Sequence, residues 1–129
     1  NEIYIIENNT FSNLENLNRI LLSTNSIIQL EINSFHNLKN LEHLELSQNK
    51  IEHLSPIEIK RMKWFYFSAN QLKIIKSNYF FYLNNLHILD LRYNQIENLE
   101  VNAFNGLDIL NSLYLSFNQI KSISNEIFY

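Results

Sequence analysis

The chain has 129 residues, of which 46% are hydrophobic, a net charge of −3 and no cysteine. Its hydrophobic content is sufficient for the core of one domain, and the lack of cysteine excludes disulfides and thiolate metal sites. The small net charge argues against nucleic acid or an anionic membrane as partner. No apolar run approaches the ~18 residues of a membrane span, so we expect no membrane insertion.

A short sequence unit recurs along the chain. Its clearest copy is Leu86–Gln95, followed by Ile96, and it reads L-x-x-L-x-L-x-x-N-x-I. The same pattern begins at positions 17, 41, 62 and 110, so successive units lie 24, 21, 24 and 24 residues apart. A self-similar period in the low twenties indicates an array of stacked structural repeats.

The repeat frame divides the chain as a single array. A partial repeat at 1–16 precedes a full repeat at 17–40, a short repeat at 41–61, full repeats at 62–85 and 86–109, and a partial repeat at 110–129. Each repeat of such an array buries its apolar face only against its neighbours, so the ends need caps. We therefore expect a segment of a longer protein, or ends that a partner covers; the alternative is a self-capped domain.

Each repeat begins with a short predicted strand. Apolar residues alternate there with polar ones, which is the period of a strand with one buried face. The apolar residues expected to point inward include Leu44, Phe65, Leu89 and Leu113. Because about 20 residues connect one strand to the next, we expect the strands to stack parallel and in register.

An asparagine stands eight positions after the first residue of every unit. The aligned residues are Asn25, Asn49, Asn70, Asn94 and Asn118. The amide of asparagine donates and accepts hydrogen bonds at once. We expect these residues to form a ladder that satisfies backbone groups of the turns between repeats, since one glycine and one proline are too few to shape so many turns.

The second half of each repeat carries an aromatic residue. Phe35, Phe80 and Phe104 are expected to fill the wider outer side of the stack, which bends the array with the sheet on the inside of the curve. The short repeat has Ile59 at this position, and it contains Pro56, the only proline. We interpret it as a shorter outer loop with a local change of curvature; the alternative is a functional basic rim at 60–64, beside Trp64.

The full pattern, L-x-x-L-x-L-x-x-N-x-I-x-x-L-x-x-x-x-F-x-x-L, resembles leucine-rich repeats of the 24-residue extracellular type. It is similar to Toll-type receptor ectodomains and to related secreted immune and adhesion proteins. The resemblance implies a right-handed solenoid or horseshoe, with a parallel β-sheet on the concave face and loops with short 3-10 or helical turns on the convex face. It also implies an extracellular or cell-surface location. The Cys-rich flanking caps of many such proteins are absent from this sequence.

The candidate binding residues are those that point outward from the strands, because packing does not dictate them. A row of serines at one outward position is interrupted by Arg92, two residues from Asp90, and exposed aromatic residues surround this pair. Tyr, Trp and Arg are enriched at protein-binding hot spots. The candidate ligand-binding residues are His43, Glu45, Trp64, Tyr66, Asp90, Arg92, Tyr93, Tyr114 and Phe117.

These residues favour a non-catalytic module that binds a protein partner through the concave sheet. Three alternatives remain open: an ordinary surface ion pair with Tyr93 and Phe117 tucked against the turns, a self-associating or spacing scaffold, and a carbohydrate-binding surface on the aromatic rings. His43 beside Glu45 is the nearest approach to an acid–base pair, but no nucleophile accompanies it. No spacing suits a metal, so we expect neither an enzyme nor a cofactor.

One modification motif is present. Asn8-Asn9-Thr10 is an N-glycosylation sequon. In the repeat frame Asn8 falls on a loop outside the strand, so a glycan there would leave the concave sheet open.

Overall fold

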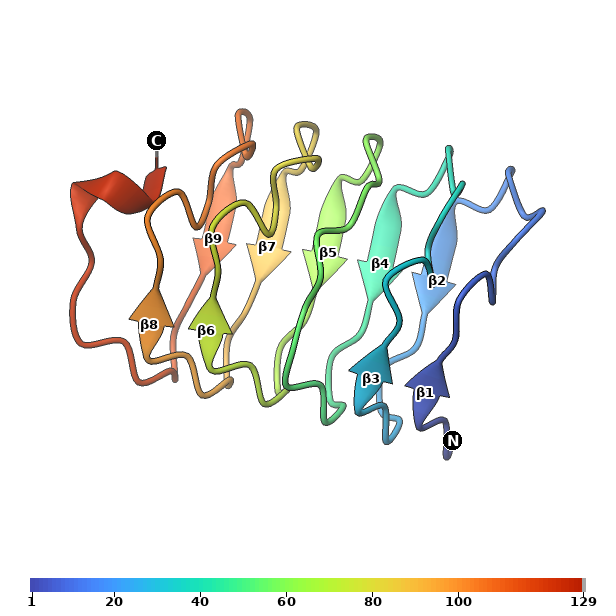
Figure 1. Cartoon of the computed structure of the whole chain (residues 1–129), viewed down its shortest axis with the longest axis horizontal. Helices are drawn as coiled ribbons and strands as arrows, with labels where there is room; N and C mark the ends of the chain where they lie inside the picture. The colour runs from blue at the N-terminus through green and yellow to red at the C-terminus, as the bar shows by residue number, and fades with distance from the viewer. Residues whose placement is uncertain (129) are drawn as a thin grey trace.

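The computed structural model describes residues 1–128, which form a two-layered solenoid of parallel strands. The first layer is a five-stranded sheet in the order β2-β4-β5-β7-β9, and all of its neighbouring strands run parallel (Figure 1). Its strands are β2 (Arg19–Leu21), β4 (His43–Glu45), β5 (Trp64–Tyr66), β7 (Ile88–Asp90) and β9 (Ser112–Tyr114). Every predicted repeat from position 17 onward contributes one of these strands, which form the concave face of the solenoid.

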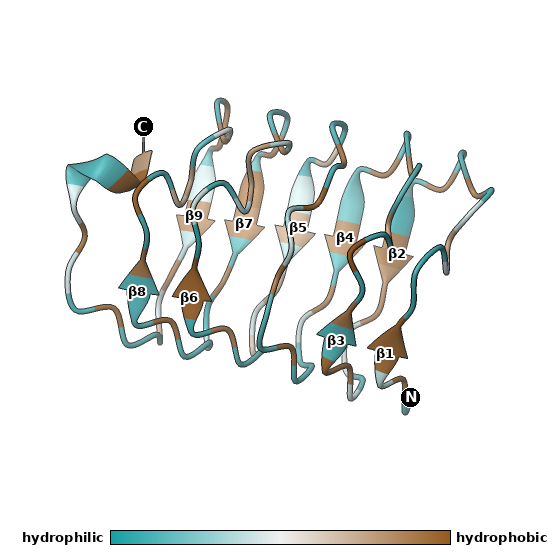
Figure 2. Cartoon of the chain, in the orientation of Figure 1, coloured by the Kyte–Doolittle hydropathy of each residue, from teal (hydrophilic) through white to brown (hydrophobic). Residues whose placement is uncertain are grey.

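A second layer lies on the opposite, convex side. It contains β1 (Ile5–Ile6) paired with β3 (Gln29–Leu30), and β6 (Ile74–Ile75) paired with β8 (Asn98–Leu99). Among residues 1–128 the only helical element is the 3-10 helix η1 (Asn125–Phe128). Figure 2 shows β1 and β6 hydrophobic along their length. The resemblance to leucine-rich repeats implied loops and helical turns on this side. The strand pairs were not predicted, because strands of two residues are too short to show a period.

The strands of the concave sheet are in register, so equivalent repeat positions form rows. One row joins Arg19, His43, Trp64, Ile88 and Ser112 across the five strands. The middle residues of the strands point into the core, where Leu44, Phe65 and Leu89 are fully buried. This is the alternation that the sequence predicts, and it leaves the residues on either side of each middle residue pointing outward.

Aromatic residues fill the core on the convex side. Phe35, Phe80 and Phe104 are buried there. The rings of Phe80 and Phe104 stack with centroids 6.0 Å apart, and those of Phe11 and Phe35 stack at 5.7 Å. Stacked rings from successive repeats extend the core along the solenoid axis, because each repeat presents the same face to its neighbour.

The aligned asparagines connect neighbouring repeats through hydrogen bonds. The Nδ2 of Asn94 donates to the carbonyl of Leu91 in its own repeat, at 3.1 Å, and to that of Phe67 in the preceding repeat, at 3.0 Å. Its Oδ1 accepts from the backbone N–H of Leu72 at 3.1 Å. The same kinds of bond are made by Asn49, Asn70 and Asn118. Asn25 bonds the carbonyl of Leu22 and the N–H of Ile3.

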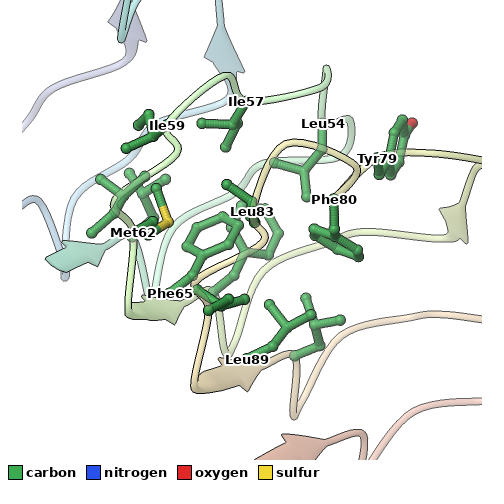
Figure 3. Packing of buried hydrophobic residues seen from close by; sticks show 14 of the residues in the cluster. Leu54, Ile57, Ile59, Met62, Phe65, Tyr79, Phe80, Leu83 and Leu89 are labelled. Carbon is green, nitrogen blue, oxygen red and sulfur yellow. The ribbon is translucent and has the colours of Figure 1, made fainter. Parts of the chain in front are cut away.

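The short repeat keeps the concave sheet continuous but interrupts the convex layer. Strand β4 pairs with β5 in register, whereas within residues 1–128 no strand lies between β3 and β6 on the convex side (Figure 1). Figure 3 shows Leu54, Ile57 and Ile59 of this repeat above Met62 and Phe65. Ile59 is buried at the place where the other repeats have phenylalanine, so aliphatic residues fill the core of the shortened turn.

Candidate functional site

The outward residues of the concave sheet gather most of the candidate site residues on one face. Strand β4 presents His43 and Glu45, and β5 presents Trp64 and Tyr66. In the second outward row, Glu45, Tyr66, Asp90 and Tyr114 lie on successive strands. Adjacent strands are ~4.8 Å apart, so a partner that covers this face contacts side chains of several repeats at once.

Asp90 and Arg92 form a two-point ion pair. The Asp90 carboxylate accepts hydrogen bonds from Nε of Arg92 at 2.9 Å and from Nη2 at 2.7 Å, and it also accepts the Arg92 backbone N–H at 3.1 Å. The Arg92 side chain is 44% exposed and that of Asp90 only 4%. The hydrogen bond and the charge of Asp90 raise the pKa of Arg92. The sequence placed both residues on the surface, but Asp90 is covered and therefore positions Arg92 rather than meeting solvent.

Two tyrosines flank this ion pair. Cζ of Arg92 lies 5.0 Å from the centroid of the Tyr114 ring, which is a cation–π distance. Tyr66 lies between Glu45 and Asp90 in the sheet register. Burial raises the pKa of Tyr66, and the negative charges of Glu45 and Asp90 raise it further, so its phenol stays protonated and able to donate a hydrogen bond. Together these groups form a mixed aromatic and cationic patch over β5, β7 and β9.

A shallow hollow adjoins the patch over β2, β4 and β5. It has a volume of about 360 Å³ and is lined by Asn18, Arg19, His43, Trp64 and Tyr66. The His43 ring lies 6.1 Å from Trp64 and 5.4 Å from Tyr66, measured between centroids. Burial lowers the pKa of His43, and the positive charge of Arg19 adds to this effect while Glu45 opposes it.

Asn18 and Arg19 line the hollow but were not among the residues predicted for the site from the sequence. Arg19 is an outward strand residue directly opposite His43, so the repeat frame held the signal for it. Asn18 precedes the strand, so the alternating pattern does not predict whether its side chain points inward or outward. Arg19 has no carboxylate within 4 Å among residues 1–128, whereas Lys63, beside Trp64, pairs with Glu42 at 2.9 Å.

Glu45 is bonded to the row of serines. One of its carboxylate oxygens accepts the Ser23 hydroxyl at 2.8 Å and the Ser47 backbone N–H at 3.3 Å. Asp90 bonds the backbone N–H of Arg92 in the same way, two residues further along its chain. The acidic residues of this face are therefore held by local donors.

Tyr93 and Phe117 form an exposed aromatic pair at the edge of the concave face. Their rings stack with centroids 4.3 Å apart and planes 5° from parallel, and the residues are 54% and 67% exposed. Both backbones have positive φ, 55° and 60°, a region that large side chains rarely adopt. The rings stack on each other and both residues are exposed, so they present an apolar surface to solvent.

Asn8 lies away from the concave sheet, directly after β1 of the convex layer. Its Oδ1 accepts the backbone N–H of Asn33 at 3.0 Å, and its own N–H donates to the Glu31 carboxylate at 2.7 Å. The residue is exposed. Its glycosylation stays a prediction.

Two further features concern metals and membranes. Within residues 1–128, no three His, Cys, Asp or Glu side chains lie close enough together to hold a metal ion. In the same range no helix is long and apolar enough to cross a membrane.

Comparisons with known proteins agree with this geometry. The family model described as leucine rich repeat matches residues 1–51, 15–63 and 84–129. The crystal structure of a TLR13–ssRNA13 complex is similar over 91% of this chain, with a TM-score of 0.87 and 28% sequence identity. The chain spans 17% of the length of that TLR13 chain. A search of curated protein sequences gave no match. The repeat pattern, the parallel two-layered solenoid and the family match together show that this chain belongs to the leucine-rich repeat family.

Proposed function

We propose that the chain is a non-catalytic recognition module that binds a protein partner through its concave sheet. The observation that carries the proposal is the patch of Trp64, Tyr66, Arg92 and Tyr114, in which Asp90 fixes the arginine. Tyr, Trp and Arg supply large contact areas with few rotatable bonds, and they dominate the energy of protein interfaces. A guanidinium that is already oriented loses little entropy when a partner covers it.

The stacked pair of Tyr93 and Phe117 supports the same proposal. Two large side chains stay exposed at a turn position where the other repeats have Thr24, Gln48 and Ala69, all with the same positive φ. Burial of the pair against a partner would gain apolar contact that the isolated chain lacks. The binding surface would then extend from the hollow at His43 and Trp64 to the edge at Phe117.

Two other ligand classes are alternatives on the same face. A sugar ring would stack on Trp64 or Tyr66 inside the hollow, with Asn18 and Arg19 as hydrogen-bond donors. The TLR13 structure is a complex with single-stranded RNA, but an RNA-binding groove needs unpaired cations for the phosphates. Here Arg92 is paired with Asp90 and Lys63 with Glu42, which leaves Arg19 as the one unpaired cation among the residues of the hollow and the patch, and Glu45 adds negative charge beside them, so a protein ligand is favoured.

Binding assays with matched variants test the proposal. The chain is screened against a panel of secreted and cell-surface proteins, a glycan array and single-stranded RNA, with affinities then measured by calorimetry. Trp64→Ala and Tyr114→Ala should each weaken the affinity for a protein ligand by tenfold or more. Phe81→Ala removes an exposed aromatic from the convex side and should leave the affinity unchanged.

The outcomes separate the ligand classes. Binding confined to glycans, or to RNA, and lost in Trp64→Ala would replace the protein ligand with that class. A concentration-dependent mass that persists in both concave variants would favour a self-associating scaffold. Equal loss of binding in Phe81→Ala would move the site away from the concave sheet.

We further propose that the module belongs to an extracellular or cell-surface protein of the immune or adhesion type. The repeat type and the likeness to TLR13 support this location. The exposed sequon at Asn8 lies outside the concave face, where a glycan is compatible with ligand binding. Expression in a secretory host should give a product whose mass falls on glycosidase treatment and on Asn8→Gln; an unchanged mass would remove this support.

A further inference from the structure

The short repeat leaves a groove on the convex side of the solenoid. One wall is the segment 30–36, at the end of β3 and in the turn that follows it, and the other is the segment 54–58, with Tyr82 at one end. The groove has a volume of about 440 Å³. It lies where the repeat at 41–61 has three residues fewer than its neighbours, so the missing length opens the convex surface.

The groove combines an apolar lining with negative charge. Leu30, Ile32, Pro56 and Ile57 contribute apolar surface, and Ile32 is 72% exposed. Glu31 and Glu58 supply two carboxylates, and the lining contains no lysine or arginine. Glu58 is exposed and has no cation within 4 Å among residues 1–128. A ligand for this groove needs apolar groups and a positive charge.

The strands beside the groove favour an extended ligand. Strand β3 is hydrogen-bonded to β1 along one edge, and within the described residues no strand pairs with its other edge. Strand β6, beyond the short repeat, pairs only with β8. A free strand edge presents unpaired backbone groups that an extended peptide can bind, and alternate side chains of such a peptide point toward the same surface.

We propose that this groove binds an extended segment of a protein partner, with apolar side chains at alternate positions and a lysine or arginine beside Glu58. The apolar side chains would cover Ile32 and Pro56, and the backbone would lie beside the end of β3. The site lies on the face opposite the concave patch and does not depend on the ligand of that patch. The solenoid would then have two binding surfaces.

A displayed library of random decapeptides tests the proposal on the intact chain. The library is selected on the wild-type chain, with counter-selection on Ile32→Ser, and the selected peptides are synthesised. We expect alternating apolar residues with at least one lysine or arginine. The peptides should shift backbone amide NMR signals in 30–36 and 54–58 and leave those of β4, β5 and β7 unmoved.

Matched variants supply the controls. Ile32→Ser and Glu58→Lys should each weaken binding tenfold or more. Val101 occupies the position equivalent to Ile32, seven residues after its repeat asparagine, and is also exposed, so Val101→Ser should leave the affinity unchanged. Glu97→Lys, on the convex side of another repeat, matches the charge change of Glu58→Lys and should have no effect.

Several results would overturn the proposal. Selected peptides that bind Ile32→Ser as tightly as wild type, that are acidic, or that shift concave amides would place the interaction elsewhere. A concentration-dependent mass abolished by Ile32→Ser would show that a second copy of the chain, and not a peptide segment, covers the groove. The absence of any enriched peptide would also reject it.

Discussion

The guanidinium of Arg92 is held at two points by Asp90, although only the arginine is exposed. The aspartate thereby turns a flexible cationic side chain into a fixed part of the concave surface. Asp90 lies in the second outward row, between Tyr66 and Tyr114. Stability and recognition are therefore linked at this position.

Arg92→Ala should lower the free energy of unfolding, because it leaves the buried Asp90 carboxylate without its cation. Asp90→Asn should cost less, since the amide still accepts a hydrogen bond and carries no charge. Urea unfolding of both variants and of Asp90→Asn/Arg92→Ala measures the coupling. Additive losses within ~0.5 kcal/mol would show that the pair contributes no interaction energy.

Asn94→Ala should destabilise the array more than any surface change. It leaves the buried Leu72 N–H without its partner, which costs about 1–3 kcal/mol. It also removes one of the two asparagine donors to each of the Phe67 and Leu91 carbonyls, which keep their bonds from Asn70 and Asn118. The neighbouring Gln95 makes no side-chain hydrogen bond among residues 1–128, so Gln95→Ala should change stability by less than ~0.5 kcal/mol. Denaturant unfolding compares the two. Similar midpoints would mean that water replaces the asparagine bonds.

Gly106→Ala should be destabilising because both the backbone conformation and the space exclude a side chain. Gly106 has φ +87°, and a Cβ atom would lie 2.4 Å from the carbonyl oxygen of Phe81. The conformation alone costs roughly 1–3 kcal/mol, before the displacement of Phe81. Ala69 has φ 53°, so Ala69→Gly relieves the same kind of conformation and should be neutral or stabilising. Thermal unfolding that ranks the two changes in the opposite order would contradict this account.

His43 should make stability depend on pH. Burial and Arg19 lower its pKa in the folded chain below the ordinary value of 6.5. The unfolded chain therefore binds a proton more readily, so stability contributed by neutral His43 is complete above pH 6.5 and is lost as the pH falls toward the lowered pKa. NMR titration should show the low pKa, and Arg19→Gln should raise it. His43→Gln should reduce the loss of stability below pH 6.5. If the free energy of unfolding of this variant falls with pH as steeply as that of the wild type, other groups cause the pH dependence.

Much of the fold was predictable because one spacing repeats. Every unit sets an asparagine eight positions after its first residue, and the alternating pattern correctly gave Leu44, Phe65 and Leu89 as buried residues of the concave sheet. It did not predict that Asp90 is buried or that Leu113, on the last strand, is only half-buried. The pairing of β1 with β3 and of β6 with β8 was not predictable, since two residues do not define a period. These pairs depend on how neighbouring repeats stack, which sequence patterns within one repeat do not show.

The candidate site was less predictable than the fold. The period of two correctly placed Asp90 on the outward side of its strand, but it gave no sign that Arg92 covers the carboxylate. Asn18 was missed because it lies before the strand begins. The convex groove depends on the walls at 30–36 and 54–58 and on Tyr82, which are distant in sequence and meet only across the shortened turn. The role of the concave residues in binding stays a prediction.

The interruption of the convex layer also has a mechanical consequence. A solenoid resists bending and twisting through the connections between adjacent repeats. Within residues 1–128, convex strand pairs lie on either side of the short repeat, β1 with β3 and β6 with β8, but at residues 41–61 strand pairing runs only through the concave sheet, from β2 to β4 and β5. The array is therefore two stiff blocks joined by a more compliant turn, and a ligand on the concave sheet that spans both blocks would set the angle between them.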